Sequence, residues 1–417
     1  MAPKVLVVGS GGREHALVRA LRRSPQRPEV LSSPGGNAGI AEEAEIVSGD
    51  PERIAVERAV DLVVVGPEGP LVDGLADRLA AAGVRCFGPS AAAARLEGSK
   101  AFAKEVMAAA GVATAAYRVV TTVEEGIDAI AGFPAVVKAD GLAAGKGVVI
   151  AENEQAAREA LHVFLVERRY GDAPVVVEKH LEGEELSLLA LCDGERAVPM
   201  APAQDYKRIF DGDRGPNTGG MGSYSPVPGI DPARAQEICA RVHQPVVDLL
   251  RERGTPVHGV LYAGLMLTAE GPRVIEFNVR FGDPETQALL PRLRSDLLEA
   301  LTATTETGGL KGASLEWSEE CAVTIVLASA GYPASSSSGD VISGLERVPP
   351  EVEITHAGTA RLDGRLVTGG GRVLNVTALG HDPAAARDAA YAAAEMISFR
   401  GRQLRRDIAL RAVERAR

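Results

Sequence analysis

The strongest constraint on the fold is a pattern repeated in the first hundred residues. A short apolar run is followed by a glycine-containing turn and then by a helical segment. The runs Val5–Val8 and Asp61–Val65 read as buried strands, and the turns Gly9–Gly12 and Gly66–Glu68 follow them directly. Strands separated by helices predict a parallel sheet with right-handed crossovers. Ligands bind at the carboxyl edge of such sheets, so we expect these turns to border a ligand site.

Beyond residue 100 the pattern changes to α+β, with short strands that favour antiparallel pairing. A strand hairpin is expected over Gly259–Thr268 and Arg273–Phe277. Ala201–Pro228 is rich in Gly, Pro, Asp and Thr and has little periodicity, so we expect a long functional loop there. Strands near Ala322–Leu327 and Arg372–Ala378, followed by two helices, indicate a further α+β region.

The charge balance and the apolar pattern exclude several classes of protein. Lys and Arg number 45 against 56 Asp and Glu, a net charge of −11, whereas general nucleic-acid binding depends on cations that neutralise phosphates. The longest apolar stretch, Cys321–Ala330, is shorter than the roughly 20 residues of a membrane span. The start at Met1 lacks the apolar region of a signal peptide. We therefore expect a cytoplasmic protein that binds neither nucleic acid nor membrane.

The first glycine loop, Gly9–His15, follows a strand and opens a helix. It is similar to a dinucleotide fingerprint, but Glu14 stands where the third glycine is required, and Val30–Ser33 supplies no acid for a ribose. These differences disfavour a dehydrogenase. Backbone N–H groups at a helix N-terminus still attract an anion, and Arg13 adds further donors. We favour the phosphate of a small substrate over a tight structural turn.

The second glycine loop, Lys138–Gly147, combines two lysines with small residues. It is similar to a Walker loop but is one residue short, and Gly147 replaces the Ser or Thr that binds Mg²⁺. It also joins strand to strand instead of strand to helix. Such a hairpin can fold over a triphosphate as a mobile lid, as kinase glycine loops do. A plain flexible hairpin is the alternative.

A third motif places polar side chains along the strand that begins at Val274. Residues two apart in a strand share a face, so Glu276 and Asn278 project together, and so does Arg280 if the strand continues. Hard oxygen ligands of this kind suit Mg²⁺ bridged to phosphates. Arg280 could clamp a carboxylate or neutralise a migrating phosphoryl group. The alternative is a solvated polar face of an edge strand.

A fourth motif covers the end of another buried strand and the segment that follows it. The strand from Val175 ends in the acid Glu178, and a short crossing segment leads to a second acid, Glu185. This arrangement fits a hinge around an adenine and its ribose. Taken alone, the motif carries less weight than the other three.

Together and in this order, the four motifs resemble the ATP-grasp superfamily and, within it, the phosphoribosylamine–glycine ligase family. Arg280–Gln287 resembles the signature octapeptide of that family. The other matching segments are Leu96–Lys100, Lys138–Gly147, Gly215–Pro226, His356–Thr359 and Val376–His381. The resemblance runs from Val5 to about Glu414, nearly the whole chain.

The resemblance implies an architecture and a reaction. It implies an N-terminal parallel-sheet domain over 1–99 that binds phosphoribosylamine, a two-lobed ATP-grasp domain over 100–318 with a mobile lid lobe at about 115–186, and a C-terminal α+β domain over 319–417. The implied reaction joins glycine to 5-phosphoribosylamine, with ATP converted to ADP and phosphate through a glycyl phosphate. It is the second step of purine (IMP) synthesis. We expect a monomer or a weak homodimer.

The resemblance also assigns the nucleotide and metal sites. Lysines would contact the phosphates of ATP, the glycine loop would cover them, and an acidic hinge would hold adenine and ribose. These cofactor-binding residues are Lys104, Lys138, Gly145, Lys146, Gly147, Glu178, Leu181 and Glu185. Glu276 and Asn278 would hold Mg²⁺, with Mn²⁺ as an alternative metal.

The remaining assignments concern the substrates and the reacting groups. The sugar-phosphate and acceptor side would comprise Gly11, Gly12, Arg13, Asn37, Asp205, Lys207, Gly219, Gly220 and Arg280. The residues expected to act in catalysis are Arg280, Lys138 and Asp283.

Four positions depart from the family pattern, namely Ser10, Tyr206, Gly369 and Ala409. The strand preceding Glu276 carries no acid, so a second metal held wholly by protein is not expected. Another ATP-grasp carboxylate–amine ligase is the nearest alternative function. A nucleotide-binding regulatory module without turnover is another, but a module of that kind would be expected to lose part of the site.

Overall fold

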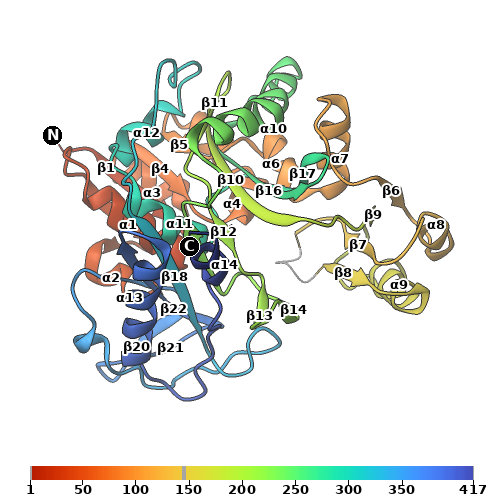
Figure 1. Ribbon diagram of the computed structural model, residues 1–417. Helices are drawn as coiled ribbons and strands as arrows, with labels where there is room; N and C mark the ends of the chain where they lie inside the picture. The colour runs from red at the N-terminus through yellow and green to blue at the C-terminus, as the bar shows by residue number, and fades with distance from the viewer. Residues whose placement is uncertain (1, 143–146, 417) are drawn as a thin grey trace.

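The computed structural model describes residues 2–142 and 147–416. The N-terminal and C-terminal parts pack side by side, and a smaller lobe projects from them on the right of Figure 1. The predicted lid residues Gly145 and Lys146 lie outside the described residues. No helix in the described ranges is long and apolar enough to cross a membrane.

The N-terminal part is built on the predicted parallel sheet. Its strand order is β3(Glu45–Ile46)-β2(Glu29–Ser33)-β1(Lys4–Val8)-β4(Leu62–Val65)-β5(Arg85–Phe87). The connecting helices are α1(Gly12–Arg22), α2(Ile40–Glu43), α3(Pro51–Glu57), α4(Glu68–Val72), α5(Leu75–Ala81) and α6(Ala91–Gly98). Strands β1 and β4 pair in parallel, so the glycine turns that follow them lie together at the carboxyl edge.

The projecting lobe has an antiparallel sheet with a core of its own. The strand order is β6(Tyr117–Val120)-β9(Val175–Lys179)-β7(Ala135–Ala139)-β8(Val148–Ala151). The helices α8(Val123–Asp128) and α9(Glu154–Leu161) belong to it, and a π-helical turn, His162–Val166, extends α9. Val137, Leu161, Phe164 and Val175 form part of a cluster separate from the main core.

The central sheet contains the predicted hairpin. Its order is β11(Ala197–Pro199)-β10(Glu184–Asp193)-β16(His258–Thr268)-β17(Gly271–Asn278), and α7(Lys100–Ala109) and α10(Pro232–Glu252) pack beside it. Strand β17 ends at Asn278. Arg280 therefore lies beyond the strand, and its direction is set by tertiary contacts instead of strand alternation.

The segment expected as a long loop forms four short strands. They are β12(Gln204–Asp205), β13(Arg208–Phe210), β14(Arg214–Asn217) and β15(Gly222–Ser225). The expectation of an irregular loop was wrong because strands of two to four residues are too short to show alternation. One of them, β15, also pairs with a strand far along the chain, in the sheet order β12-β15-β18(Cys321–Ala328)-β22(Arg372–Gly380)-β19(Glu353–His356).

The rest of the C-terminal part covers this sheet. Helices α11(Glu285–Leu289) and α12(Leu297–Ala303) lie between β15 and β18 along the chain. A hairpin, β20(Thr359–Leu362) and β21(Arg365–Thr368), and the helices α13(Pro383–Met396) and α14(Leu410–Ala416) belong to the C-terminal part. Short 3₁₀ turns occur at Leu290–Arg292 and Leu345–Arg347.

The main core crosses the expected domain limits, because β15 and β18 share a sheet. We predict that Ile325→Ala, at a fully buried position in β18, lowers the free energy of unfolding by about 2–5 kcal/mol. Amide hydrogen exchange should then lose protection in β10 as well as in β18. As a control, Val137→Ala in the separate core of the lobe should leave exchange in β18 unchanged. Loss confined to residues 319–417 in the Ile325 variant would contradict a shared core.

Candidate active site

The metal-binding pair predicted from sequence lies on one face of the central sheet. Asn278 is directly opposite Tyr262, and Glu276 is directly opposite Gly264 in the register of β16 and β17. Gly264 has no side chain, so the carboxylate of Glu276 has room beside it. Ser187 of β10 is opposite Gly264 in turn. A polar strip thus crosses three strands of an otherwise apolar sheet.

Glu276 carries a negative charge without a direct partner. Burial acts to raise the pKa of Glu276, but the surrounding cations, Lys207 first, hold that pKa below its ordinary value. Those cations are Lys207, Lys138, Lys100 and Arg280. Within the described ranges, neither Glu276 nor the nearly buried Asn278 makes a side-chain hydrogen bond or ion pair. Two free oxygen donors on one strand suit a hard divalent cation.

No group of three or more His, Cys, Asp or Glu side chains in the described residues could enclose a metal ion. The donor set at Glu276 and Asn278 is therefore incomplete by itself. Mg²⁺ characteristically binds through one or two protein oxygens together with water and substrate phosphates. The residues present fit a magnesium ion of that kind and do not fit a closed structural site.

Two predicted phosphate-binding lysines meet a predicted hinge acid. Glu178 forms ion pairs with Lys104 at 3.0 Å and with Lys138 at 2.8 Å, and all three side chains are buried. Lys104 also donates to Thr114 Oγ1, at 2.6 Å. Burial lowers the pKa of Lys104 to about 8, although the charge of Glu178 opposes that shift. Residues of α7, β7 and β9 thus bring the ammonium groups of Lys104 and Lys138 together beside the Glu178 carboxylate.

The acceptor-side residues form a second polar cluster, which is partly exposed. Lys207 Nζ lies 2.9 Å from Glu185 Oε2. Burial, opposed by Lys207 and assisted by Glu285, raises the pKa of Asp205 above its usual range. Glu285 Oε1 accepts hydrogen bonds from Tyr262 at 3.0 Å and from Ser187 at 3.2 Å. The structure therefore joins Asp205, Lys207 and Glu185 to the polar strip of the sheet.

The base of the predicted lid is fixed against α7. Asp140 accepts hydrogen bonds from the Ser99 hydroxyl at 2.9 Å and from the backbone N–H of Ala101 at 3.2 Å. Lys100 Nζ donates to the carbonyl of Gly141 at 2.8 Å. At the other end, the carbonyl of Gly147 accepts from Ala139. Sequence reasoning gave Lys100 and Asp140 no role, although both lie in segments that carried the resemblance.

Arg280 is held by two carboxylates from the N-terminal part. Its guanidinium lies 3.2 Å from Glu68 and 3.0 Å from Glu97. Glu97 also accepts the backbone N–H of Val279 at 2.8 Å. Burial raises the pKa of Glu97 to about 6, even though Arg280 opposes the shift. The two acids fix the direction of a side chain that the strand no longer controls.

A pocket of about 330 Å³ opens between the N-terminal and C-terminal parts. Its walls come from the turn after β1, the segment after β19 and the signature loop. The lining residues are Ser10, Gly11, Gly12, Gly36, Asp283, Ala357, Gly358, Gly369 and Arg372. The first N–H groups of α1 have no partner within the helix, so this wall offers donors to an anion.

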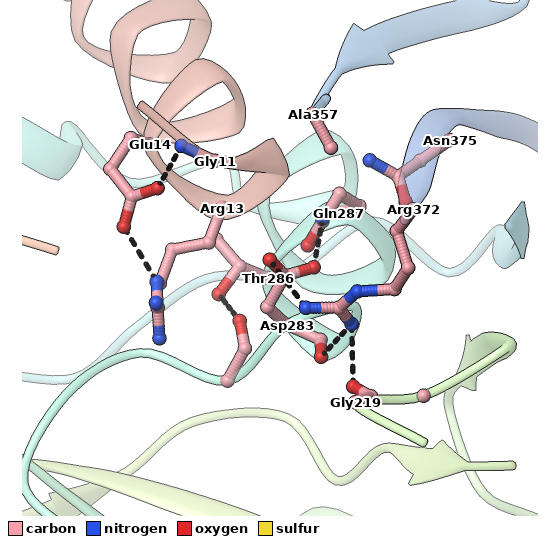
Figure 2. A network of polar contacts seen from close by, with 12 residues as sticks. Gly11, Arg13, Glu14, Gly219, Asp283, Thr286, Gln287, Ala357, Arg372 and Asn375 are labelled. Carbon is pink, nitrogen blue, oxygen red and sulfur yellow. Dashed lines mark hydrogen bonds and ion pairs between the residues drawn. The ribbon is translucent and has the colours of Figure 1, made fainter. Parts of the chain in front are cut away.

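Arg372 links the walls of this pocket, as Figure 2 shows. Its guanidinium pairs with the Asp283 carboxylate at 3.2 Å and donates to the Asp283 carbonyl at 2.8 Å and to the carbonyl of Gly219. Burial raises the pKa of Asp283, but Arg372 more than offsets it, so the net pKa is below the usual value. Sequence reasoning missed Arg372, which stands at the start of a strand with no motif of its own.

Arg13 and Asn37, which were predicted to bind the phosphate, make hydrogen bonds to other parts of the protein. Arg13 turns away from the pocket, binding Glu14 at 2.7 Å and the carbonyl of Phe281 at 2.9 Å. The Asn37 amide donates to the carbonyl of His356 at 2.7 Å, and its oxygen accepts from the N–H of Gly39 at 3.0 Å. Both side chains therefore shape the pocket from behind instead of lining it.

Three other predicted residues lie close to these sites. Gly219 contacts Arg372, and a side chain at Gly220 would meet Pro284 at 2.4 Å. Leu181 lies in the connection between β9 and β10, after Glu178. Most of the predicted residues that the structure describes therefore belong to three places. These are the lysine-rich site around Lys104, Lys138 and Glu178, the acceptor cluster around Asp205, Lys207 and Glu185, and the pocket or its immediate surroundings.

Family models match nearly the whole chain. The N domain of phosphoribosylglycinamide synthetase matches residues 3–97, its ATP-grasp (A) domain residues 98–286 and its C domain residues 322–411. The chain belongs to the phosphoribosylglycinamide synthetase family. The predicted limits at 1–99, 100–318 and 319–417 stay predictions, because the sheet that contains β12, β15 and β18 crosses residue 318.

Curated relatives match over nearly the whole of this chain. The phosphoribosylamine–glycine ligase of Streptomyces coelicolor is 51% identical, over 98% of this chain and 99% of its own. The trifunctional purine biosynthetic protein adenosine-3 of Gallus gallus is 47% identical over 99% of this chain and 42% of its own. The crystal structure of phosphoribosylamine–glycine ligase from Thermotoga maritima has a TM-score of 0.84 and 36% identity, covering 97% of this chain and 100% of that one.

A more distant likeness concerns the fold alone. The biotin carboxylase of Campylobacter jejuni, solved as a β,γ-ATP complex, has a TM-score of 0.73 with 15% identity, and the match covers 99% of this chain and 95% of that one. The likeness shows that this chain shares the overall fold of that enzyme. This level of identity gives no information about the acceptor substrate.

The burial of Glu97 yields a pH prediction. Its pKa is about 6 in the folded protein against 4.5 for the free side chain, so protonation favours folding. Its contribution to stability is present below pH 4.5 and lost as the pH rises through 6, a loss of roughly 2 kcal/mol. As the pH rises from 4.5 to 6, the unfolding temperature of the wild type should fall relative to that of the Glu97→Gln variant. Glu105→Gln is the control. Arg253 lowers the pKa of Glu105, so the unfolding temperature of the wild type relative to this variant should change with pH in the opposite direction.

Proposed function

We propose that this protein is an ATP-dependent ligase that joins glycine to 5-phosphoribosylamine, giving glycinamide ribonucleotide, ADP and phosphate. This is the second step of purine synthesis. The supporting observation is the position of the loop that begins at Arg280. Arg280 is one of the four cations that lower the pKa of Glu276, and three residues later Asp283 lines the pocket. An acyl phosphate formed at one site would be next to an amine bound in the other.

The names of the relatives support the same conclusion, since full-length relatives at about half identity are phosphoribosylamine–glycine ligases. In this proposal the pocket holds the sugar phosphate, with the N-terminus of α1 and Arg372 facing the anion. A cytoplasmic location and a monomer or weak homodimer belong to the same proposal.

The nucleotide would bind between the projecting lobe and the central sheet. Lys104 and Lys138 would contact its phosphates, with Glu178, the segment at Leu181 and Glu185 on the adenine and ribose side. The glycine loop that contains Gly145, Lys146 and Gly147 would cover the triphosphate. Because water would hydrolyse an acyl phosphate, such a cover serves the chemistry as well as binding.

Glu276 and Asn278 would hold Mg²⁺ or Mn²⁺ against the phosphates. When bound, the metal would withdraw charge from the γ-phosphate oxygens. The chain's own cations would do the same from other sides, with Lys138 and Arg280 facing the transferring group. Asp205 and Lys207 would orient glycine so that its carboxylate attacks the γ-phosphate in line. The amine of phosphoribosylamine would then displace phosphate from the glycyl carbon.

Turnover measurements test the reaction directly. ADP release should require glycine and phosphoribosylamine together, and glycine labelled with heavy oxygen in its carboxylate should transfer one labelled oxygen to inorganic phosphate. Label in AMP, with release of pyrophosphate, would exclude the acyl phosphate. Faster turnover with a different carboxylic acid would identify another carboxylate–amine ligase of the same fold.

The pocket assignment predicts a selective defect. A Cβ at Gly12 would lie 2.4 Å from Asn375 Nδ2 and 2.7 Å from Gln287 Nε2. Gly12→Ala should therefore raise the KM for phosphoribosylamine at least about tenfold, because the turn must shift at the phosphate. The KM for ATP should stay unchanged. Gly132→Ala, where a Cβ meets nothing within 4 Å, is the control, and a raised KM for ATP in the Gly12 variant would assign the pocket to the nucleotide.

The metal assignment predicts the effect of removing one charge. Glu276→Gln keeps the shape of the side chain but weakens the metal site, so turnover should fall by about 10³-fold or more. The unfolding temperature should change little, since Glu276 has no protein partner within the described ranges. Titration with Mg²⁺ and Mn²⁺ should show a raised metal requirement. Near-normal activity at saturating Mg²⁺ would reject Glu276 as a ligand.

A further inference from the structure

The C-terminal tail contains a fully buried guanidinium outside the sites described above. Arg405 has no exposed surface, and its charge is balanced by Asp407 at 2.6 Å and Asp213 at 2.9 Å. A second nitrogen binds the other oxygen of Asp407 at 2.8 Å, so that pair is bidentate. Arg405 also donates to the carbonyl of Arg208 at 3.1 Å. We call the ion pairs of Arg405 with Asp407 and Asp213 the clamp. Burying a charge costs free energy unless it is fully paired, so the clamp favours one arrangement of the tail against the segment that contains Asp213.

The clamp holds the β13–β14 hairpin, which lies below β12 and α14 in Figure 1. The tail makes three more polar contacts with the turn of this hairpin. Asp407 accepts the N–H of Gly212 at 2.8 Å, Asp211 accepts the N–H of Arg406 at 2.8 Å, and Arg411 pairs with Asp213 at 2.9 Å.

Apolar packing contributes little to the position of this hairpin. Phe210 is 54% exposed, and Ile209 contributes only to a small cluster with Met221, Val326 and Ala328. The hairpin therefore depends on the tail for its position.

Tyr206 carries the effect of the clamp to the acceptor cluster. The ring of Tyr206 lies under the Arg405 guanidinium, 4.8 Å from its centre, and the Tyr206 hydroxyl accepts the N–H of Ala409 at 3.0 Å. Tyr206 follows Asp205 and precedes Lys207. Side chains alternate along an extended chain, so the residue facing the tail lies between two that face the acceptor site.

The backbone at Ala409 supports a specific role for this contact. Ala409 has φ of +61°, in the left-handed region that a residue with a side chain adopts at a cost. Such strain persists where surrounding contacts determine the conformation. Here the strained peptide directs its N–H to the Tyr206 hydroxyl, 203 residues earlier in the chain.

We propose that the tail segment Arg405–Arg411 positions Asp205 and Lys207 for the acceptor acid, acting through Tyr206. The assignment of glycine to these residues rests on the proposed function. Arg405 is a positioning residue, because it touches neither pocket nor metal pair. Since Lys104 and Lys138 lie on α7 and β7, away from the hairpin, loosening the clamp should affect the acceptor acid and spare the nucleotide.

The decisive variant is Arg405→Lys, which keeps the charge but loses the planar fork that binds two acids. Its KM for glycine should rise about tenfold, because Asp205 and Lys207 would no longer be correctly oriented toward glycine. The KM for ATP should stay within about twofold. Arg402→Lys is the matched control. Arg402 lies in the same tail but binds Glu395 at 2.8 Å and carbonyls within the C-terminal part, and both KM values should stay unchanged.

A measurement without substrates separates this proposal from the proposed function. Amide hydrogen exchange over residues 204–218 should accelerate in Arg405→Lys and not in Arg402→Lys, whatever the substrates are. If Arg405→Lys does not fold, Tyr206→Phe decides, since it removes only the acceptor of the Ala409 N–H and should raise the KM for glycine alone. An unchanged KM for glycine, or equal rises for glycine and ATP, would overturn the proposal. Wild-type protein without glycine-dependent turnover would overturn the proposed function instead.

Discussion

The loop from Arg280 to Asp283 is the junction on which the rest of the site depends. Arg280 pairs with Glu68 and Glu97 of the N-terminal part, and Asp283 pairs with Arg372 of the C-terminal part. These pairs are largely removed from water, so separating them would leave uncompensated charge and cost far more than a surface ion pair. Three charged contacts therefore define one relative placement of three segments distant in sequence.

This junction connects the two candidate sites. The lysine-rich site is built on the central sheet and the projecting lobe, whereas the pocket is built on the turn after β1 and the segment after β19. Each could form without the other. Because the loop contributes to both, motion of Asp283 in response to a ligand would be transmitted to Arg280 within three residues.

Local patterns in the sequence predicted most of the fold and the residue types of the site. The parallel sheet followed from apolar runs before glycine turns, and the β16–β17 hairpin followed from alternation that also placed Glu276 and Asn278 on one face. The strands within Ala201–Pro228 were missed because they are short and one of them, β15, pairs with the distant strand β18.

The contacts of individual charged residues were the least predictable part. Arg13 and Asn37 have the right chemistry for a phosphate, yet their donors are taken by Phe281 and His356. Arg372 was missed because its partner Asp283 is 89 residues away and no periodicity connects them. A sequence motif specifies which groups are available, and only the packing decides whether each group binds a ligand or the protein.

The net charge illustrates the same distinction between composition and placement. A chain with a charge of −11 would repel nucleotides and sugar phosphates over most of its surface. Attraction is restored locally, because Lys104, Lys138 and Arg372 are withdrawn from water, and charges interact more strongly in a low-dielectric interior. Their carboxylate partners limit that field until a ligand competes for the same cations. An acidic protein of this kind would hold anions where its buried cations converge, so placement, not total charge, would determine what it binds.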